Sequence, residues 1–324
     1  IRLSLVGSEM CIRDSLDTGS YIFNALCSTS IFGGVSDNKI TAIAGAEATG
    51  KTFFALSICN NFMKQNPKGG IVYFDTEGAI TKELLEKRGM DPTGKQFLTI
   101  DCLTVEDFRN VAYKILDKYN SQKEEDRQPM LMVLDSLGNL STEKETKDIA
   151  DGKSVRDMSK AQLVKGAFRV LTQKLSIAKV PLIVLNHTYD VIGSYMPTKE
   201  MGGGSGLKYA ATTIIYLSKS QEKEGTERVG NIIKAKVAKS RISKENEQIA
   251  TRLYYDERGL DKYYGLVELA EKGGIWKKVS TRYEVDGKKI YASEIYKNPE
   301  KYFTQEVLEK IDTVAKQTFS YGEK

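Results

Sequence analysis

The sequence has few prolines, few cysteines, one histidine and no long apolar run, and each of these scarcities excludes a class of protein. Only 6 prolines occur among 324 residues, with 40% hydrophobic and 28% charged residues, which is typical of a globular chain and not of a disordered or fibrous one. No apolar run approaches the roughly 20 residues that a membrane-spanning helix needs. The longest strong run, residues 180–185, has the length of a buried strand. These features favour a soluble chain with one large core and a smaller appendage.

Cysteine, histidine and net charge are limited as well. The cysteines Cys11, Cys27, Cys59 and Cys102 lack metal-ligand spacing, and His187 is the only histidine. Without a secretory signal, this cysteine usage predicts a reduced, cytoplasmic setting. The net charge of +5 permits a polyanionic partner without requiring one, because the distribution of charge matters more than its sum.

The first fifteen residues have no helical or strand period. Residues 4–15 (SLVGSEMCIRDS) look like the translation of a sequencing-library adapter, so we expect residues 1–15 to be a non-native segment that does not belong to the fold. The alternative is a genuine, poorly ordered terminus. Neither interpretation assigns a function to this segment.

From residue 40 onward, short apolar runs alternate with longer amphipathic segments. The runs expected as buried strands are residues 40–45, 71–75, 97–101, 130–135, 180–186 and 212–218. The segments with helical spacing are residues 51–66, 81–88, 105–121 and 155–178. This alternation predicts an α/β fold with a mostly parallel sheet covered on both faces. We expect the core at residues 16–262 and a small α+β domain at residues 263–324, with a hairpin turn at Asp286 and Gly287.

Two stretches break this rhythm and are expected as functional loops. Residues 141–154 are polar and highly charged, and residues 188–207 include a run of glycines from Gly202. Loops of this length inside a compact domain are usually functional, and both follow strands at the sheet edge where α/β proteins bind ligands.

One motif carries the chemistry. Residues 45–52 fit G-x-x-x-x-G-K-[ST] between an expected strand and an expected helix: Gly45, Ala46, Glu47, Ala48, Thr49, Gly50, Lys51 and Thr52. Glycines let backbone N–H groups turn toward phosphate oxygens, and the helix adds its positive end. Lys51 can reach the β- and γ-phosphates, and the Thr52 hydroxyl can coordinate Mg²⁺. The motif predicts nucleotide binding.

Polar residues at three other strand ends complete the expected site. Asp135 ends an apolar strand and would lie near Mg²⁺; an ordinary strand-end aspartate is the alternative. Glu77 is the candidate for orienting the attacking water, although surface acids at strand ends are common. His187 could sense the γ-phosphate, although a lone histidine is more often structural.

These residues together resemble the RecA family, and within it the strand-exchange recombinases of T4-type bacteriophages. The resemblance runs from about residue 16 to residue 319. Its most specific pieces are residues 135–140 (DSLGNL), 144–148 (KETKD), 155–159 (VRDMS), 186–189 (NHTY) and 201–206 (MGGGSG). The resemblance implies a RecA-like P-loop ATPase core.

The resemblance also implies roles for single residues. Glu77 matches the family's catalytic glutamate, and His187 falls where the bacterial proteins have a glutamine sensor of the γ-phosphate. Lys239 and Arg241 match basic residues that reach a neighbouring subunit's ATP; an exposed basic strand end is the alternative. Residues 141–154 and 188–207 would be the DNA-binding loops. The positions expected to contact DNA are Arg156, Ser159, Gly202, Gly203, Gly204 and Lys208.

Two of the departures from the family pattern bear on assembly and on ATP binding. The N-terminal helix and strand that dock onto a neighbouring protomer should precede residue 16 and are absent or replaced by the adapter-like segment, which puts efficient polymerisation in doubt. The aromatic that stacks on adenine in the bacterial proteins corresponds to Leu84 here, so base contacts are expected to differ.

The implied activity is DNA-dependent ATP hydrolysis with Mg²⁺, in filaments on single-stranded DNA that promote pairing and strand exchange with homologous double-stranded DNA. Implied partners are further copies of the chain, a single-strand-binding protein and a recombination mediator, with no membrane, in the host cytoplasm if phage-encoded. The alternatives are a RecA-like hexameric helicase or repair ATPase, a DNA-coating scaffold that hydrolyses little, and a small-molecule kinase.

Overall fold

The computed structural model describes residues 15–152, 159–190, 199–202, 205–224 and 227–322. Its helices are α1 (Tyr21–Ser28), α2 (Lys51–Gln65), α3 (Lys82–Glu86), α4 (Val105–Asn120), α5 (Glu143–Ala150), α6 (Lys160–Ala178), α7 (Ser205–Ala210), α8 (Leu266–Lys272), α9 (Ala292–Lys297), α10 (Pro299–Tyr302) and α11 (Gln305–Phe319). Two short 3₁₀ turns are η2 (Glu124–Asp126) and η3 (Leu137–Asn139).

The strands form one large sheet and two small ones. They are β1 (Ser15–Leu16), β2 (Val35–Ser36), β3 (Ile40–Gly45), β4 (Gly70–Asp75), β5 (Phe97–Asp101), β6 (Met130–Asp135), β7 (Leu182–Asp190), β8 (Lys199–Met201), β9 (Thr213–Glu224), β10 (Glu227–Ser240), β11 (Gln248–Tyr254), β12 (Lys277–Val279), β13 (Arg282–Val285) and β14 (Lys288–Ile290). The large sheet has the order β11-β10-β9-β3-β7-β6-β4-β5, with β8 paired to β7.

The central part of this sheet is parallel. β9, β3, β7, β6, β4 and β5 pair in parallel, whereas β10 and β11 extend the β9 side antiparallel. The alternating strand and helix pattern of the sequence therefore gives the expected mostly parallel sheet. The carboxyl ends of its parallel strands meet at one edge, which is where α/β sheets hold ligands.

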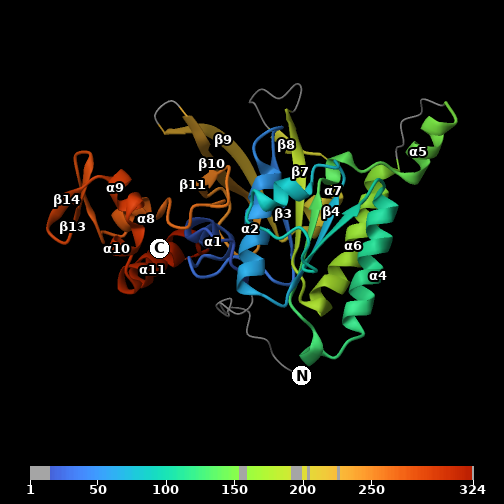
Figure 1. Cartoon of the computed structure of the whole chain (residues 1–324), viewed down its shortest axis with the longest axis horizontal. Helices are drawn as coiled ribbons and strands as arrows, with labels where there is room; N and C mark the ends of the chain where they lie inside the picture. Colours follow the sequence, from blue (N-terminus) through green and yellow to red (C-terminus); the bar gives the residue numbers. More distant parts are fainter. Residues whose placement is uncertain (1–14, 153–158, 191–198, 203–204, 225–226, 323–324) are drawn as a thin grey trace.

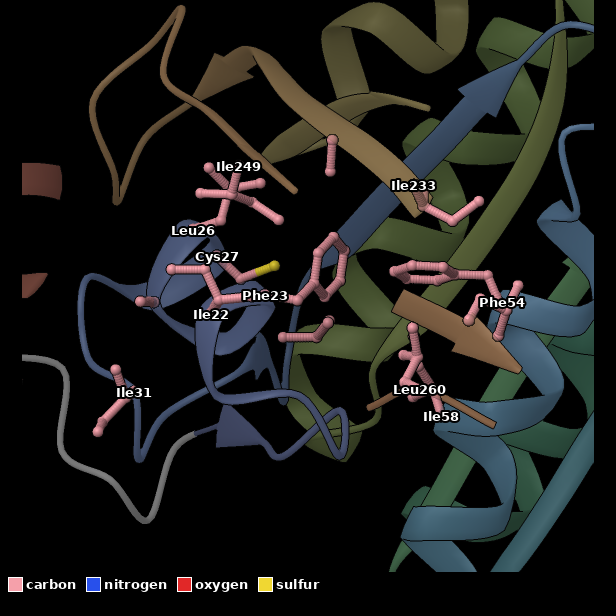
Figure 2. Packing of buried hydrophobic residues seen from close by; sticks show 14 of the residues in the cluster. Ile22, Phe23, Leu26, Cys27, Ile31, Phe54, Ile58, Ile233, Ile249 and Leu260 are labelled. Atoms are coloured by element: carbon pink, nitrogen blue, oxygen red, sulfur yellow. The ribbon is translucent and has the colours of Figure 1, made fainter. Parts of the chain in front are cut away.

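Helices cover both faces of the sheet, and alternating strand residues supply both cores. Along β3, Ile43 lies in the core shared with α1 and α2, whereas Ala42 and Ala44 lie in the core under α4 and α6. Figure 1 shows α4 and α6 side by side on one flank. Figure 2 shows the other core, where the rings of Phe23 and Phe54 meet edge to face with centroids 4.7 Å apart.

The C-terminal elements α8–α11 and the sheet β12-β13-β14 lie at the far end of the molecule from α4 and α6 (Figure 1). The β13–β14 hairpin turns at Asp286 and Gly287, both with positive φ (48° and 75°), as the sequence predicts. This part also contacts the core: the Ile31 N–H and Ser30 hydroxyl donate to the Asp312 carboxylate of α11. The division near residue 262 remains a proposal.

The two expected loops contain regular structure. Within residues 141–154, the segment Glu143–Ala150 is helix α5, because Thr142 and Glu145 form a capping box that outweighs the polar composition. Within residues 188–207, β7 continues to Asp190, β8 pairs with it antiparallel, and α7 begins at Ser205. Within the described ranges, no helix is both long and apolar enough to cross a bilayer.

Candidate functional site

The carboxyl ends of four neighbouring parallel strands bring the expected site residues together. In the sheet register Gly45 at the end of β3 pairs with His187 of β7, and Asp75 at the end of β4 pairs with Asp135 of β6. A cavity of about 1130 Å³ opens at these ends. It is lined by Glu47, Ala48, Gly50, Lys51, Thr52, Phe53, Glu77, Ala79, Leu84, Asp135, Asn139, His187, Thr188 and Tyr189.

The glycine-rich loop between β3 and α2 forms one wall of this cavity. Gly45 cannot be replaced without a shift, because an added Cβ would lie 2.9 Å from the Leu217 carbonyl oxygen. Gly50 has a φ of 88°, which favours glycine, and it precedes the first residue of α2. The loop therefore presents backbone and a helix N-terminus to the cavity, as phosphate binding requires.

Lys51 is buried beneath this loop with only 6% of its surface exposed. Its ammonium donates to the carbonyl oxygens of Gly45 (3.1 Å) and Ala46 (3.0 Å). Burial lowers the pKa of Lys51, and the nearby carboxylates of Asp135, Glu77 and Glu47 oppose this shift. The lysine is therefore a cation held at the cavity floor by carbonyls and surrounding acids.

Asp135 is the buried acid of the site. Its Oδ2 accepts hydrogen bonds from the Thr52 hydroxyl and the Tyr73 hydroxyl, both at 2.7 Å. Burial raises the pKa of Asp135, whereas these two hydrogen bonds lower it. A hydroxyl beside a carboxylate fits Mg²⁺, which binds proteins through one or two oxygen ligands and keeps several waters.

Glu77 follows β4 and receives hydrogen bonds through one of its oxygens. Its Oε1 lies 2.6 Å from Asn139 Nδ2, 3.3 Å from Ser136 Oγ and 3.3 Å from His187 Nε2. The glutamate side chain is 36% exposed. The carboxylate is thus held by the protein yet reachable by water.

His187 lies between Glu77 and Lys51. Its Nε2 faces the Glu77 carboxylate, which can only accept, and its Nδ1 lies 3.5 Å from the Lys51 ammonium, which can only donate. With a proton on Nε2 and none on Nδ1, the ring donates to Glu77 and accepts from Lys51. His187 therefore connects the residue expected to bind the γ-phosphate with the residue expected to orient water.

Comparison with known proteins identifies the family. A sequence profile described as the RecA N-terminal domain matches residues 3–261. This chain belongs to the RecA family. Its α/β core has the RecA-like fold that the sequence predicts.

Individual RecA-family relatives agree with this assignment. The chain is 31% identical over 258 residues to the recombination and repair protein of Enterobacteria phage T4, a match covering 80% of this chain and 63% of that protein. It is 29% identical over 264 residues to the protein RecA of Arthrobacter sp. (strain FB24), covering 80% and 70%. The protein RecA of Fusobacterium nucleatum is 27% identical over 299 residues, covering 89% and 73%. The matched part thus spans less than two thirds of the T4 protein.

Of the residues that the RecA resemblance assigns to DNA, three lie in described segments and three lie outside the described ranges. Gly202 pairs with β7, since its N–H donates to the His187 carbonyl (3.1 Å) and its carbonyl accepts from Asn186 Nδ2 (2.8 Å). Lys208 lies on α7, and Ser159 directly precedes α6. Arg156, Gly203 and Gly204 lie outside the described residues. The DNA contacts remain predictions.

Lys239 and Arg241, which the RecA resemblance assigns to a neighbouring subunit, do not line the cleft of their own chain. The Lys239 ammonium donates to the carbonyl oxygens of Lys208 (2.6 Å) and Ala211 (2.8 Å) at the end of α7. Burial and the adjacent Arg241 lower the pKa of Lys239. Arg241 itself is exposed. Their role toward another protomer remains a prediction.

Three further residues of the site in this RecA-family chain stand at positions that no motif marks. Tyr73 binds Asp135, Asn139 binds Glu77, and the Thr76 hydroxyl accepts from the Ser136 N–H at 2.8 Å. One signal was available for Tyr73: a phenol hydroxyl inside a buried strand needs a hydrogen-bond partner.

Replacing Tyr73 with Phe tests the buried contact to Asp135. Because the lost hydrogen bond favours the ionised carboxylate, we expect the free energy of unfolding to fall by about 1–2 kcal/mol near pH 8 and by less near pH 4. The direction follows from proton linkage. Because the pKa of Asp135 is raised in the folded chain, the stability that Asp135 contributes is present at low pH and is lost as pH rises through that pKa. Removing the Tyr73 hydroxyl raises this pKa further and so enlarges the loss at high pH.

Urea unfolding at both pH values measures the difference between Tyr73→Phe and the unchanged protein. Tyr119→Phe is the matched control, since the Tyr119 hydroxyl donates to the Gln128 carbonyl at 2.8 Å at an exposed site. An equal loss for Tyr73→Phe at both pH values would contradict the coupling to Asp135.

Proposed function

We propose that this chain is an ATP-dependent recombination protein that forms filaments on single-stranded DNA and promotes homologous pairing and strand exchange. One observation supports this most strongly: Lys51, Asp135, Glu77 and His187 meet in one cleft, and His187 leads directly into residues 188–207. The relationship to a T4 recombination and repair protein supports the same function.

ATP binding is assigned to residues 45–52. The backbone N–H groups of the loop and the N-terminus of α2 would hold phosphate oxygens, and Lys51 would reach the β- and γ-phosphates. Bound phosphates would replace the carbonyl oxygens of Gly45 and Ala46 as acceptors for the Lys51 ammonium. Thr52 and Asp135 would hold Mg²⁺, which offsets negative charge on the phosphates when bound.

Hydrolysis is assigned to Glu77. Its carboxylate accepts a proton from a water whose oxygen attacks the γ-phosphorus, while the bond from that phosphorus to its bridging oxygen breaks. The proton then passes to the released phosphate. Lys51 and, from a neighbouring subunit, Lys239 and Arg241 offset the charge that develops on the phosphate oxygens.

Coupling to DNA is assigned to the end of β7. His187 contacts Lys51 and Glu77 in the cleft, and the His187 carbonyl receives the Gly202 N–H. Occupancy of the γ-phosphate position would therefore act on the pairing of His187 with Gly202, which belongs to residues 188–207 that the family pattern assigns to DNA. Base pairing between strands selects the sequence, because backbone contacts carry no sequence information.

The test is the ATPase rate with and without single-stranded DNA at low salt, together with electron microscopy of the complex. We expect single-stranded DNA to stimulate the ATPase rate strongly and the complex to form helical filaments. Rings would favour a hexameric helicase, and an unstimulated rate would contradict the proposal. Adding a single-strand-binding protein and a mediator then tests the expected partners.

A further inference from the structure

We propose that Asn139 is a positioning residue that holds the Glu77 carboxylate in its productive orientation. This inference rests on the proposed function, because it concerns how Glu77 orients the attacking water. Asn139 lies in η3, four residues after Asp135, and its amide lines the same cleft.

The contacts of Glu77 place all protein donors on one side of its carboxylate. Oε1 is contacted by Asn139 Nδ2, Ser136 Oγ and His187 Nε2, and the shortest of the three distances, 2.6 Å, belongs to Asn139. In the part of the chain that the structure describes, Oε2 has no hydrogen-bond partner. The carboxylate is thus anchored by one oxygen, and because Glu77 lines the cleft and is 36% exposed, its other oxygen is left for a water.

The backbones that carry Glu77 and Asn139 are fixed to each other. The Thr76 N–H donates to the Asp135 carbonyl oxygen at 2.8 Å, and the Ser136 N–H donates to the Thr76 hydroxyl at 2.8 Å. The Glu77 N–H also donates to Asp75 Oδ1 at 3.0 Å. β4 and β6 are also neighbours in the sheet. The backbone of Glu77 is therefore fixed, and only the orientation of its side chain remains to be set.

The turn that carries Asn139 is itself rigidly placed. Leu137 and Leu140, on either side, are buried in the core beneath α4 and α6. Gly138 lies against the end of β7, where an added Cβ would come within 3.2 Å of Asn186 Oδ1. A donor on such a turn has little freedom, so it can restrain a partly exposed glutamate that would otherwise sample several rotamers.

Losing the Asn139 contact should slow ATP hydrolysis and leave ATP binding unchanged. Misplacing a catalytic group by about 1 Å can cost about 100-fold in rate. We expect Asn139→Ala to lower kcat for DNA-stimulated ATP hydrolysis by about 10- to 100-fold, with KM for ATP and binding of a non-hydrolysable ATP analogue unchanged.

Asn139→Asp separates positioning from simple shape. It has nearly the same shape as asparagine, but it replaces the donor with a second carboxylate beside Glu77, which repels it. We therefore expect Asn139→Asp to be slower than Asn139→Ala, whereas a merely structural role predicts that the isosteric variant keeps the rate of the unchanged protein.

A double-mutant cycle completes the experiment. In a Glu77→Gln background, Asn139→Ala should cause no further loss of the residual rate, because its effect passes through Glu77. Asn298→Ala, an exposed asparagine that makes no capping hydrogen bond, is the matched control and should keep the full rate. Thermal unfolding of each variant checks that the chain remains folded.

Three results would overturn the assignment: a kcat for Asn139→Ala within about twofold of the unchanged protein, full activity in Asn139→Asp, or an equal further loss in the Glu77→Gln background. These outcomes are distinct from failure of the proposed function, which would appear as absent DNA-stimulated hydrolysis in the unchanged protein.

Discussion

Glu77→Gln is expected to lower ATP hydrolysis by about 10²–10⁴-fold while leaving ATP binding intact, because an amide of the same shape cannot accept the proton of the attacking water. Its neighbours Asn139 and His187 would still find an acceptor in the amide oxygen. Single-stranded DNA should therefore remain bound in the presence of ATP, since the triphosphate persists. Steady-state kinetics and equilibrium binding of a fluorescent ATP analogue measure the two effects separately.

Glu86→Gln is the matched control for this prediction. Glu86 is an exposed glutamate at the end of α3 that does not line the cleft, so the change removes an equal charge outside the site. Its rate should stay within about twofold of the unchanged protein, as for most surface substitutions. Unchanged turnover in Glu77→Gln would remove Glu77 from its assigned role and direct attention to the other acids of the cleft.

Lys51→Ala is expected to abolish hydrolysis, with a loss of about 10³-fold or more, and to weaken ATP binding as well. The lysine is the buried cation of the cavity, and the cluster of Asp135, Glu77 and Glu47 around it would repel a triphosphate once its charge is gone. Unlike Glu77→Gln, this variant should also fail to hold single-stranded DNA when ATP is added.

Lys64→Ala provides the comparison for Lys51→Ala. Lys64 is an exposed lysine in the last turn of α2, at the opposite end of this helix from the loop. It should keep both activities. Near-normal hydrolysis in Lys51→Ala would contradict the assignment of residues 45–52 to the phosphates.

The sequence predicted the parallel sheet well because its signals are local. The apolar runs that end at Gly45, Asp75, Asp101 and Asp135 become β3, β4, β5 and β6 with those same last residues. β3, β4 and β6 are buried on both faces, so continuous hydrophobicity marks them, whereas β5 lies at the sheet edge and is only partly buried. A polar residue or glycine marks the end of each run.

The antiparallel edge of the sheet was not predicted. In β10, Ile233, Ala235 and Val237 are buried while Lys234 and Lys236 between them are exposed. A strand with one solvated face shows only this alternation, and its lysines hide the short apolar residues from a search for apolar runs. Helix α5 was missed for a related reason, since its stability comes from the capping box and not from an apolar stripe.

Part of the site was predicted because motifs and strand ends are local signals in the sequence. Lys51, Thr52, Asp135, Glu77 and His187 stand at motif positions or strand ends, so the order of elements brings them together. The contacts of Tyr73 with Asp135 and of Asn139 with Glu77 join residues 62 positions apart. They depend on the register of β4 against β6, which one sequence does not reveal.

We propose that a triphosphate in the cleft controls whether single-stranded DNA is bound. Fluorescence anisotropy of labelled single-stranded DNA measures this at one fixed salt concentration, with no nucleotide, with ADP and with a non-hydrolysable ATP analogue. We expect binding at least about tenfold tighter with the analogue than in the other two conditions. Equal affinity in all three conditions would contradict it.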